Sequence, residues 1–433
     1  MALYNDVIRI EGGQVPSGKV VVSGAKNSAT RLLAAASLCD EPVYLTGYPV
    51  NLVDSKHKER FLSQNGVQIT TESDSSLRID AKEYNPRELN SYFYPIRTTY
   101  LLVAGQLKRN RQAFIPYPGG CNIGARKYDL HIMVWESFGC KVIEKEEHIF
   151  VESPKELVGS KVTFPISTVG GTENALLMAA IAKGTTTIEN AYVTPEIEDL
   201  ITFLQRCGVS IEVEGQSFIK VVGAKKLKGH TFHVIPDRIE ALTWLIYGAI
   251  SKGNILIENV PLEAMEIPLM YLKSAGLDFF QNSNSIYISP HCLSNGAVHS
   301  FEVACGTHPG IISDMQPFYV MLGLIAIGRS RVHDYRYPER VTYVRELQKF
   351  VDQEITFEKG KISTNGPVQF NSANAVATDL RGTMAAILAA LCAPEGVSEI
   401  TGVSMALRGY NDLVIKLKSL GVEVIYETEN TEL

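Results

Sequence analysis

The stretch Asp379-Leu-Arg-Gly-Thr-Met-Ala-Ala-Ile-Leu-Ala-Ala-Leu-Cys392 is apolar on every side once its charged head is passed. A helix with this composition cannot face water, so we expect it to be buried. A short β-branched run, Glu399-Ile-Thr401, predicts a strand after it. Apolar residues then recur at helical spacing from Tyr410 to Gly421, and a glycine marks the stop. Buried helix, strand and amphipathic helix together make one α/β unit.

The same unit recurs six times, at intervals of about 70 residues. The predicted buried helices are residues 26–39, 97–108, 172–183, 237–252, 314–328 and 379–392. The strands are residues 43–46, 113–116, 186–189, 255–258, 331–333 and 399–401. The amphipathic helices are residues 54–66, 127–139, 194–208, 262–276, 340–350 and 410–421. Six copies favour two α/β domains of three units each over a single wound sheet.

The repeat also predicts where the domains divide, since no Pro-rich or Ser-rich linker separates the halves. We place the hinge near residues 236–239. The first domain then spans residues 23–236. The second comprises residues 1–22 and 237–433, with an N-terminal strand over residues 6–10. A length of 433 residues suits two or three domains.

Charge and composition exclude several classes of protein. A net charge of -6 argues against coating nucleic acid, because phosphate binding of that kind needs a basic face. The N-terminus lacks a basic segment followed by an apolar run, and the apolar stretches are interrupted well before a membrane-spanning length. We therefore expect a cytoplasmic protein with no membrane insertion. The 7 cysteines are scattered without zinc-site or disulfide spacing.

The heads of the six buried helices are polar. If the helices pack in parallel within each half, their N-termini point to one cleft and present backbone N–H groups and positive dipole ends. Such a cleft attracts phosphate or carboxylate groups. N-capping explains Thr378 and Ser313. Capping does not require Lys26, Arg97 or Arg381, which indicate an anion site.

A glycine-rich loop between Pro116 and His131 is a further candidate site. Its Arg126 and His131 would favour a thiolate at Cys121. Three glycines let the backbone approach a ligand closely: Gly119, Gly120 and Gly124. The loop is either a ligand-binding loop with a reactive thiol or a surface turn whose cysteine fills space.

Several motifs in order along the whole chain resemble the enolpyruvyl transferases, and within them the UDP-N-acetylglucosamine 1-carboxyvinyltransferases. The motifs are Gly-Ala-Lys-Asn at 24–27, Pro-Gly-Gly-Cys-x-Ile-Gly-Ala-Arg at 118–126, Pro-Asp-Arg-Ile-Glu at 236–240, Asp-Met-Gln at 314–316, Thr-Asp-Leu-Arg at 378–381 and Arg-Gly-Tyr at 408–410. The resemblance implies a two-domain inside-out α/β barrel with an active site in the cleft between the domains.

The resemblance also implies the donor chemistry. An acceptor hydroxyl joins C2 of phosphoenolpyruvate, C3 takes up a proton, and phosphate leaves the tetrahedral intermediate. Lys26, Arg126 and Arg408 match the positions that bind phosphoenolpyruvate, which needs fixed cations for its phosphate and carboxylate. Further charge around the cleft comes from Arg97, Arg340 and Arg381. Arginine suits both anionic groups because its planar fork donates two parallel bonds.

The remaining roles follow from the same resemblance. Asp314 matches the carboxylate that contacts the acceptor hydroxyl and serves as general base. Asn27 matches a residue that holds the sugar and the intermediate. Cys121 is implied to act as general acid, to form a covalent adduct or to assist product release, and to be alkylated by fosfomycin. Other substrate-binding positions are Asp129, Leu130, His131, Val169, Gly170 and Asp379. No metal or other cofactor is implied.

Some acceptor-side positions depart from the family. Lys127 replaces a proline, and the segment at 166–172 is longer than the usual Ser-Val-Gly-Ala-Thr. Ser-Ala-Thr-Arg at 28–31 replaces Ala-Ala-Leu-Pro, and Glu-Arg-Val at 339–341 replaces Asn-Arg-Phe. These changes keep the cations that match phosphoenolpyruvate-binding positions and alter residues that are expected to contact the acceptor.

The predicted function is enolpyruvyl transfer to the 3-hydroxyl of UDP-N-acetylglucosamine, the first committed step of peptidoglycan synthesis. The alternative is transfer to another nucleotide or nucleotide sugar, such as UMP in nucleoside-antibiotic synthesis. A shikimate-pathway synthase shares the fold but lacks the Cys121 loop. A silent regulatory paralogue would be expected to lose Lys26, Cys121, Asp314 or Arg408. An RNA-terminal phosphate cyclase would need a basic RNA path, so we expect no nucleic-acid partner.

Overall fold

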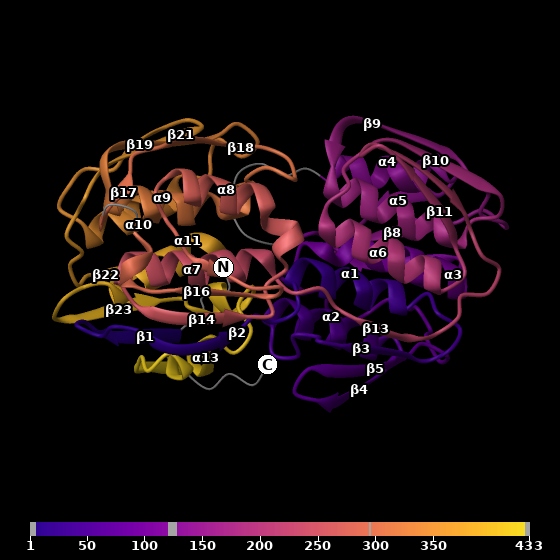
Figure 1. Cartoon of the computed structure of the whole chain (residues 1–433). Helices are drawn as coiled ribbons and strands as arrows, with labels where there is room; N and C mark the ends of the chain where they lie inside the picture. The colour runs from indigo at the N-terminus through magenta and orange to yellow at the C-terminus, as the bar shows by residue number, and fades with distance from the viewer. Residues whose placement is uncertain (1–5, 120–127, 294–295, 429–433) are drawn as a thin grey trace. The chain divides into compact units, whose positions relative to one another are not determined.

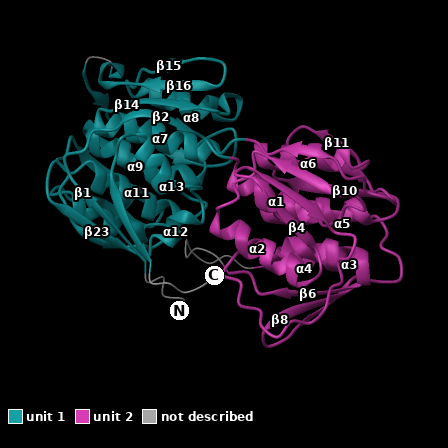
Figure 2. Cartoon of the chain, turned by 90° about the horizontal axis from the view of Figure 1, so that it is seen from below, with its two compact units in different colours: residues 1–23, 121–125, 236–433 teal, residues 24–120, 126–235 magenta. Residues whose placement is uncertain are grey.

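The computed structural model describes residues 6–119, 128–293 and 296–428. Within these ranges the chain divides into two compact units, coloured separately in Figure 2. Unit 1 contains residues 6–23 and 236–428, and unit 2 contains residues 24–119 and 128–235. Two candidate site residues, Cys121 and Arg126, lie outside the described residues, as does Lys127.

Unit 2 is built from three helix pairs and three sheets in its described part. The helices are α1 (Lys26–Ala36), α2 (Val53–Gln64), η1 (Thr98–Leu102) running into α3 (Val103–Asn110), α4 (Asp129–Ser137), α5 (Val169–Ile181) and α6 (Pro195–Arg206). The strands are β3 (Val43–Thr46), β4 (Gln68–Ser73), β5 (Ser76–Asp80), β6 (Gln112–Pro116), β7 (Lys141–Glu144), β8 (His148–Glu152), β9 (Lys161–Thr168), β10 (Thr185–Ala191), β11 (Ser210–Glu214), β12 (Phe218–Val222) and β13 (Thr231–His233). The sheet orders are β13-β3-β5-β4, β6-β8-β7 and β11-β12-β10-β9.

Unit 1 repeats the plan. Its helices are α7 (Arg238–Ser251), η2 (Leu262–Met265) with α8 (Glu266–Ser274), η3 (Pro290–Cys292), η5 (Ser313–Met315) with α9 (Gln316–Ile325), α10 (Thr342–Leu347) with η6 (Gln348–Phe350), α11 (Leu380–Leu391), α12 (Ser404–Leu407) and α13 (Leu413–Ser419). Its strands are β1 (Asp6–Glu11), β2 (Ser17–Val21), β14 (Asn254–Glu258), β15 (Phe280–Gln281), β16 (Ser285–Ile288), β17 (Val298–His299), β18 (Glu302–Cys305), β19 (Ala326–Asp334), β20 (Thr356–Glu358), β21 (Lys361–Gly366), β22 (Asn374–Val376), β23 (Val397–Thr401) and β24 (Val424–Thr428). The sheet orders are β22-β23-β1-β24, β15-β16-β14-β2 and β17-β19-β21-β20, with β18 beside β19.

Each unit has its apolar helices inside and its sheets outside (Figure 1). Every residue of α11, and every residue of α7 except the last, Ser251, is buried, and α9 packs against both α7 and α11. Strands such as β14 and β23 alternate buried and more exposed residues, so one sheet face covers the helices and the other meets solvent. The six α/β units predicted from the sequence are therefore confirmed.

Strand pairing shows how each unit closes. In unit 2, β13 lies parallel to β3 and β9 lies parallel to β10. In unit 1, β2 lies parallel to β14 and β22 lies parallel to β23. The N-terminal strand β1 pairs antiparallel with β23 and β24, as the sequence predicts for a strand that joins the second half.

The helices predicted over 26–39 and 314–328 are both too long, and α1 ends at Ala36. The sequence suggests a helix through Gly328, but α9 ends at Ile325 and β19 begins at the next residue. Gly328 has a φ of 97° and lies opposite Gly366 in the antiparallel pair with β21. A left-handed residue cannot continue an α-helix, and ladder bonds to β21 replace the helical ones.

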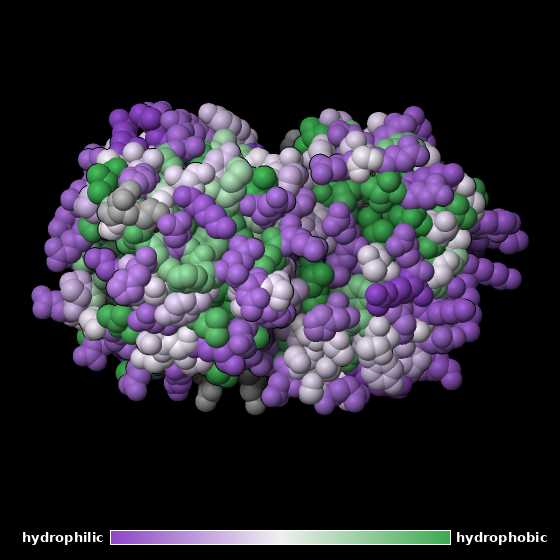
Figure 3. Space-filling view, viewed as in Figure 1, coloured by the Kyte–Doolittle hydropathy of each residue, from purple (hydrophilic) through white to green (hydrophobic). Residues whose placement is uncertain are grey.

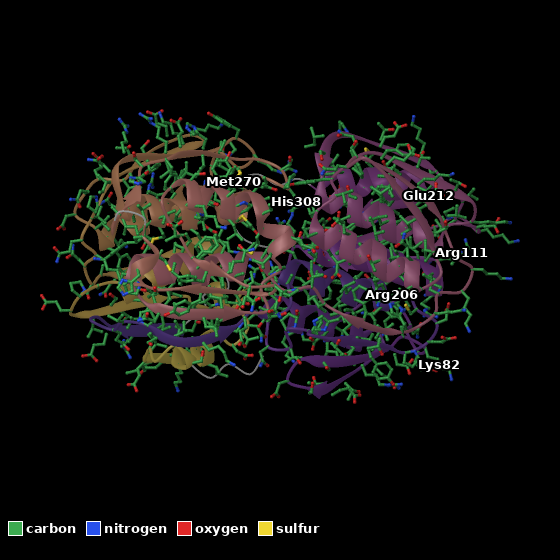
Figure 4. The ribbon with its side chains drawn as sticks, viewed as in Figure 1. Lys82, Arg111, Arg206, Glu212, Met270 and His308 are labelled. Atoms are coloured by element: carbon green, nitrogen blue, oxygen red, sulfur yellow. The ribbon has the colours of Figure 1, made fainter. Side chains whose placement is uncertain are left out.

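The outer surface is mainly polar. Figure 3 shows hydrophilic side chains over much of one face, with separate apolar areas among them. Lys82, Arg111, Arg206 and Glu212, labelled in Figure 4, are exposed on unit 2, and Met270 on α8 is a half-exposed apolar residue of unit 1. Among the described helices, none is long and apolar enough to cross a membrane.

Two isoleucines on neighbouring strands of one sheet give a test of this layering. Ile8 on β1 is 0% exposed, whereas Ile425 on β24 is 60% exposed. We expect Ile8→Ala to lower the free energy of unfolding by about 2–5 kcal/mol, because it leaves a cavity in the core. Ile425→Ala is the control and should change it by less than about 0.5 kcal/mol. Urea denaturation of both variants checks this, and equal losses would contradict the assigned sheet faces.

Candidate active site

The head of α1 holds a lysine against a carboxylate. Lys26 is the first residue of α1, and its Nζ lies 3.1 Å from Oδ2 of Asp54 in the first turn of α2. Asp54 thus pairs with the Lys26 charge, and the lysine side chain, which is 19% exposed, still reaches solvent. The residue before the helix is Ala25, whose side chain cannot cap the helix. Asn27 follows in the first turn and is half-buried.

One turn further along α1 lies a buried ion pair that the sequence analysis missed. Arg31 pairs with Glu173 of α5, and both side chains are almost completely buried. The hydroxyl of Tyr100 donates to Oε1 of Glu173 at 2.7 Å. Burial raises the pKa of Glu173, while the Arg31 charge and the Tyr100 hydrogen bond lower it. The signal in the sequence was Arg31 itself, in a helix that is otherwise apolar.

Lys58 of α2 is a second buried cation beside this pair. Its side chain is fully buried, and Nζ donates to the backbone oxygen of Thr30 at 2.7 Å. Burial lowers the pKa of Lys58 to about 7, although the charge of Glu173 raises it. Lys58 is therefore a weak source of positive charge at neutral pH.

Tyr100 connects the ion pair to His131, a predicted substrate-binding residue. The two rings stack with centroids 3.5 Å apart at 16°. Burial, followed by the charge of Arg97, lowers the pKa of His131 to about 3, so the imidazole is neutral at physiological pH. Gly170 lies against both rings, because a Cβ there would be 2.9 Å from His131 Cε1 and from the Tyr100 hydroxyl.

The other predicted site residues of unit 2 lie at the N-terminal ends of α5, α4 and η1. Val169 is the first residue of α5, and Thr168 caps that helix by accepting a hydrogen bond from the Gly171 N–H. Asp129 and Leu130 open α4, and Asp129 is exposed. Arg97 precedes η1 and is half-buried.

In unit 1, Arg340 joins two of the predicted carboxylates. It donates to Oδ1 of Asp314 at 2.9 Å and to Oδ1 of Asp379 at 2.7 Å. Burial alone would lower the pKa of Arg340, but Asp379 and Asp314 raise it well above its usual range. Asp314 keeps a side chain that is 34% exposed, so its carboxylate is both fixed and accessible.

Asp379, and not Thr378 as the sequence suggested, caps α11. Its Oδ1 accepts from the backbone N–H groups of Arg381 and Gly382, both at 3.2 Å. Arg381 is buried, with its guanidinium 4.9 Å above the Tyr410 ring and Nη2 3.9 Å from Oδ2 of Asp237. Arg381 and Asp379 therefore have partners inside unit 1.

Two further arginines of unit 1 are buried near helix ends. Arg408 ends α12, and its Nη1 lies 3.7 Å from the Met405 sulfur. Arg238 opens α7 and donates to Nδ1 of His308 at 3.4 Å; His308 is labelled in Figure 4. From the sequence, Arg238 is only part of the motif at 236–240, and His308 has no predicted role. The polar head at 236–238 was the signal that could have joined them.

Within the described ranges, no group of three or more His, Cys, Asp or Glu side chains could hold a metal ion. The structure thus gathers Lys26, His131, Gly170 and their buried supports in unit 2, and Asp314, Arg340, Asp379 and Arg381 in unit 1. The charged side chains of these described clusters are cations and carboxylates. The cations suit an anionic substrate, and a carboxylate suits the removal of a proton from a hydroxyl.

Lys58 gives a pH-dependent test of the unit 2 cluster. The unfolded chain holds a proton on Lys58 up to a pKa of 10.5, but the folded chain releases it near pH 7. Stability should therefore rise with pH between about 7 and 10, by up to about 1.4 kcal/mol per pH unit. We expect Lys58→Met to lose this contribution in urea denaturation at pH 6–9. Lys56→Met, an exposed lysine on the same helix, is the control. A Lys58→Met profile parallel to wild type would contradict the low pKa.

Comparisons with known proteins agree with this chemistry. The profile of the family EPSP synthase (3-phosphoshikimate 1-carboxyvinyltransferase) matches residues 10–417. The UDP-N-acetylglucosamine 1-carboxyvinyltransferase 2 of Bacillus cereus is 34% identical over 416 residues, which cover 96% of this chain and 95% of the relative. The UDP-N-acetylglucosamine 1-carboxyvinyltransferase of Caulobacter vibrioides is 33% identical over 425 residues, 97% of each chain.

Solved structures share the fold. The enolpyruvyl transferase NikO from Streptomyces tendae matches with a TM-score of 0.87 at 23% identity, covering 99% of this chain and 100% of that chain. EPSP synthase from Acinetobacter baumannii matches with a TM-score of 0.72 at 16% identity, covering 98% and 100%. Because the family profile and the relatives extend along nearly the whole chain, this protein belongs to the EPSP synthase family and is an enolpyruvyl transferase.

Proposed function

We propose that the protein transfers the enolpyruvyl group of phosphoenolpyruvate to the 3-hydroxyl of UDP-N-acetylglucosamine and releases phosphate. The observation that carries the proposal is Asp314, which is held at 2.9 Å by the buried Arg340 while its side chain stays 34% exposed. An ion pair of this kind favours the ionised carboxylate, which is the form a general base needs. The relatives named for this acceptor support it further.

In the proposed reaction, the oxygen of the acceptor hydroxyl forms a bond to C2 of phosphoenolpyruvate, and Asp314 accepts the proton of that hydroxyl. A proton adds to C3, which gives a tetrahedral intermediate. Loss of a proton from C3 and breakage of the C2–O bond to phosphate then restore the double bond. Lys26, Arg126 and Arg408 are proposed to hold the phosphate and carboxylate, and Cys121 is proposed as the general acid, a covalent adduct site or an aid to product release.

Arg97, Arg340 and Arg381 are proposed to add charge around the cleft. The proposed acceptor-side residues of unit 2 are Asn27, Asp129, Leu130, His131, Val169 and Gly170, and Asp379 is a further proposed substrate-binding residue in unit 1. The neutral ring of His131 suits hydrogen bonding rather than charge pairing with phosphate. A second candidate acceptor is a different uridine nucleotide such as UMP. It is favoured by Arg31, which departs from the family pattern and lies against Glu173 in the helix that Val169 opens.

Phosphate release from phosphoenolpyruvate distinguishes the acceptors. We expect purified protein to release phosphate with UDP-N-acetylglucosamine and not with UMP, because the proposed nucleophile is the 3-hydroxyl of the N-acetylglucosamine ring, which UMP lacks. Release with UMP alone would move the protein to the second acceptor class. Release with neither would overturn both.

Asp314→Asn is the catalytic control for that assay. It should lower kcat by about 100-fold or more, since the amide cannot accept the hydroxyl proton. Asp352→Asn, at an exposed position of the same unit, should leave kcat unchanged. Retention of more than about a tenth of the rate in Asp314→Asn would exclude Asp314 as the base.

Fosfomycin provides a separate test of Cys121. The thiolate is expected to open the epoxide and form a carbon–sulfur bond, so intact-mass spectrometry should show one adduct on wild type and none on Cys121→Ser. The buried Cys140 is the control, because burial raises its pKa to about 12 and suppresses its thiolate. Cys140→Ser should be modified like wild type, and an adduct on Cys121→Ser would refute the assignment.

A further inference from the structure

Side chains from four helical segments of unit 2 meet around one buried carboxylate. Glu173 of α5 pairs with Arg31 of α1 and accepts the hydroxyl hydrogen bond of Tyr100 from η1. The Tyr100 ring in turn stacks on His131 of α4. Arg31, Glu173 and Tyr100 are not part of the donor or acceptor assignments above.

Arg31 is the main cation that balances Glu173. Both side chains are at least nine-tenths buried, so a carboxylate without its partner would be strongly destabilised. Lys58 is close but loses much of its charge near neutral pH. Removal of Arg31 would therefore favour a protonated Glu173, which changes the hydrogen bond that fixes the Tyr100 hydroxyl.

The position of that hydroxyl matters because space around it is tight. The Tyr100 oxygen and His131 Cε1 each lie 2.9 Å from where a Cβ of Gly170 would stand. A shift of Tyr100 therefore moves the His131 ring, the first turn of α5, or both. His131 has a second tether through its backbone oxygen, which Asn174 approaches at 3.5 Å, and Asn174 accepts a hydrogen bond from Trp135 at 3.1 Å.

Arg31 also contacts a third proposed acceptor-side residue, Asn27. Its Nη1 donates to the backbone oxygen of Asn27, one turn earlier on α1. The donor-side Lys26 has its own partner, Asp54, at 3.1 Å. The two sides thus have different ionic supports within unit 2.

We propose that Arg31, with Glu173 and Tyr100, is a positioning residue that sets the affinity for the nucleotide acceptor by fixing His131, Gly170 and Asn27. This inference rests on the proposed function, which assigns those three residues to a uridine-nucleotide acceptor. In this inference the Arg31–Glu173 ion pair affects the affinity for the acceptor, and other groups bind phosphoenolpyruvate.

The experiment measures KM for UDP-N-acetylglucosamine, KM for phosphoenolpyruvate and kcat in Tyr100→Phe, Arg31→Met and Arg31→Lys. Tyr100→Phe keeps the ring stack and the ion pair and removes only the hydroxyl. We expect its acceptor KM to rise about tenfold or more, the effect of one lost hydrogen bond to a charged group, with the KM for phosphoenolpyruvate within about twofold of wild type. Arg31→Met should raise the acceptor KM further, and Arg31→Lys should recover part of the loss.

Arg78→Met is the matched control, since Arg78 pairs with Asp80 at 2.9 Å elsewhere in unit 2 and is partly exposed. It should change neither KM. An active wild type whose Tyr100→Phe and Arg31→Met variants show unchanged acceptor KM, or equal rises in both KM values, overturns the inference while the proposed function stands. A wild type that turns over no uridine acceptor overturns the proposed function and the inference with it.

Discussion

A charge buried at the head of a helix, or one turn inside it, requires an opposite charge beside it, and this requirement shapes both units. Desolvation of an ion costs several kcal/mol unless a partner and hydrogen bonds offset it. Arg340 meets the requirement with Asp314 and Asp379, and Arg31 meets it with Glu173. The interior can therefore hold ions close to the helix heads, where chemistry on an anionic substrate needs them.

The two units cap the N-termini of their buried helices in different ways. In unit 1, Asp237 and Asp379 cap α7 and α11 with their own carboxylates. In unit 2, α1 follows an alanine and α5 is capped by a threonine hydroxyl. Carboxylate caps cancel part of the positive helix end, whereas an alanine leaves it in place. The head of α1 therefore keeps its own positive end, and the carboxylate beside it, Asp54, pairs with Lys26 instead of capping the helix.

The sequence predicted the elements well, because apolar periodicity and glycine stops are local signals. The strand at 43–46 and the starts of α1 and α7 fall within one residue of expectation. The early end of α9 was missed, because it depends on the ladder between β19 and β21, which only the folded chain contains. Motif resemblance named Lys26, Asp314 and Arg408 as candidates, and their roles stay predictions. Arg31, Glu173 and Tyr100 come from three distant segments, so no local pattern could pair them.

Gly170 has a consequence for how this enzyme can diverge. A methyl group at that position would collide with both Tyr100 and His131 at 2.9 Å, so alanine becomes acceptable only after both rings have been displaced or replaced. The order of substitutions is thereby constrained: the rings change first and the glycine second. A lineage that keeps either ring in place keeps the glycine, and the head of α5 retains the same close backbone surface.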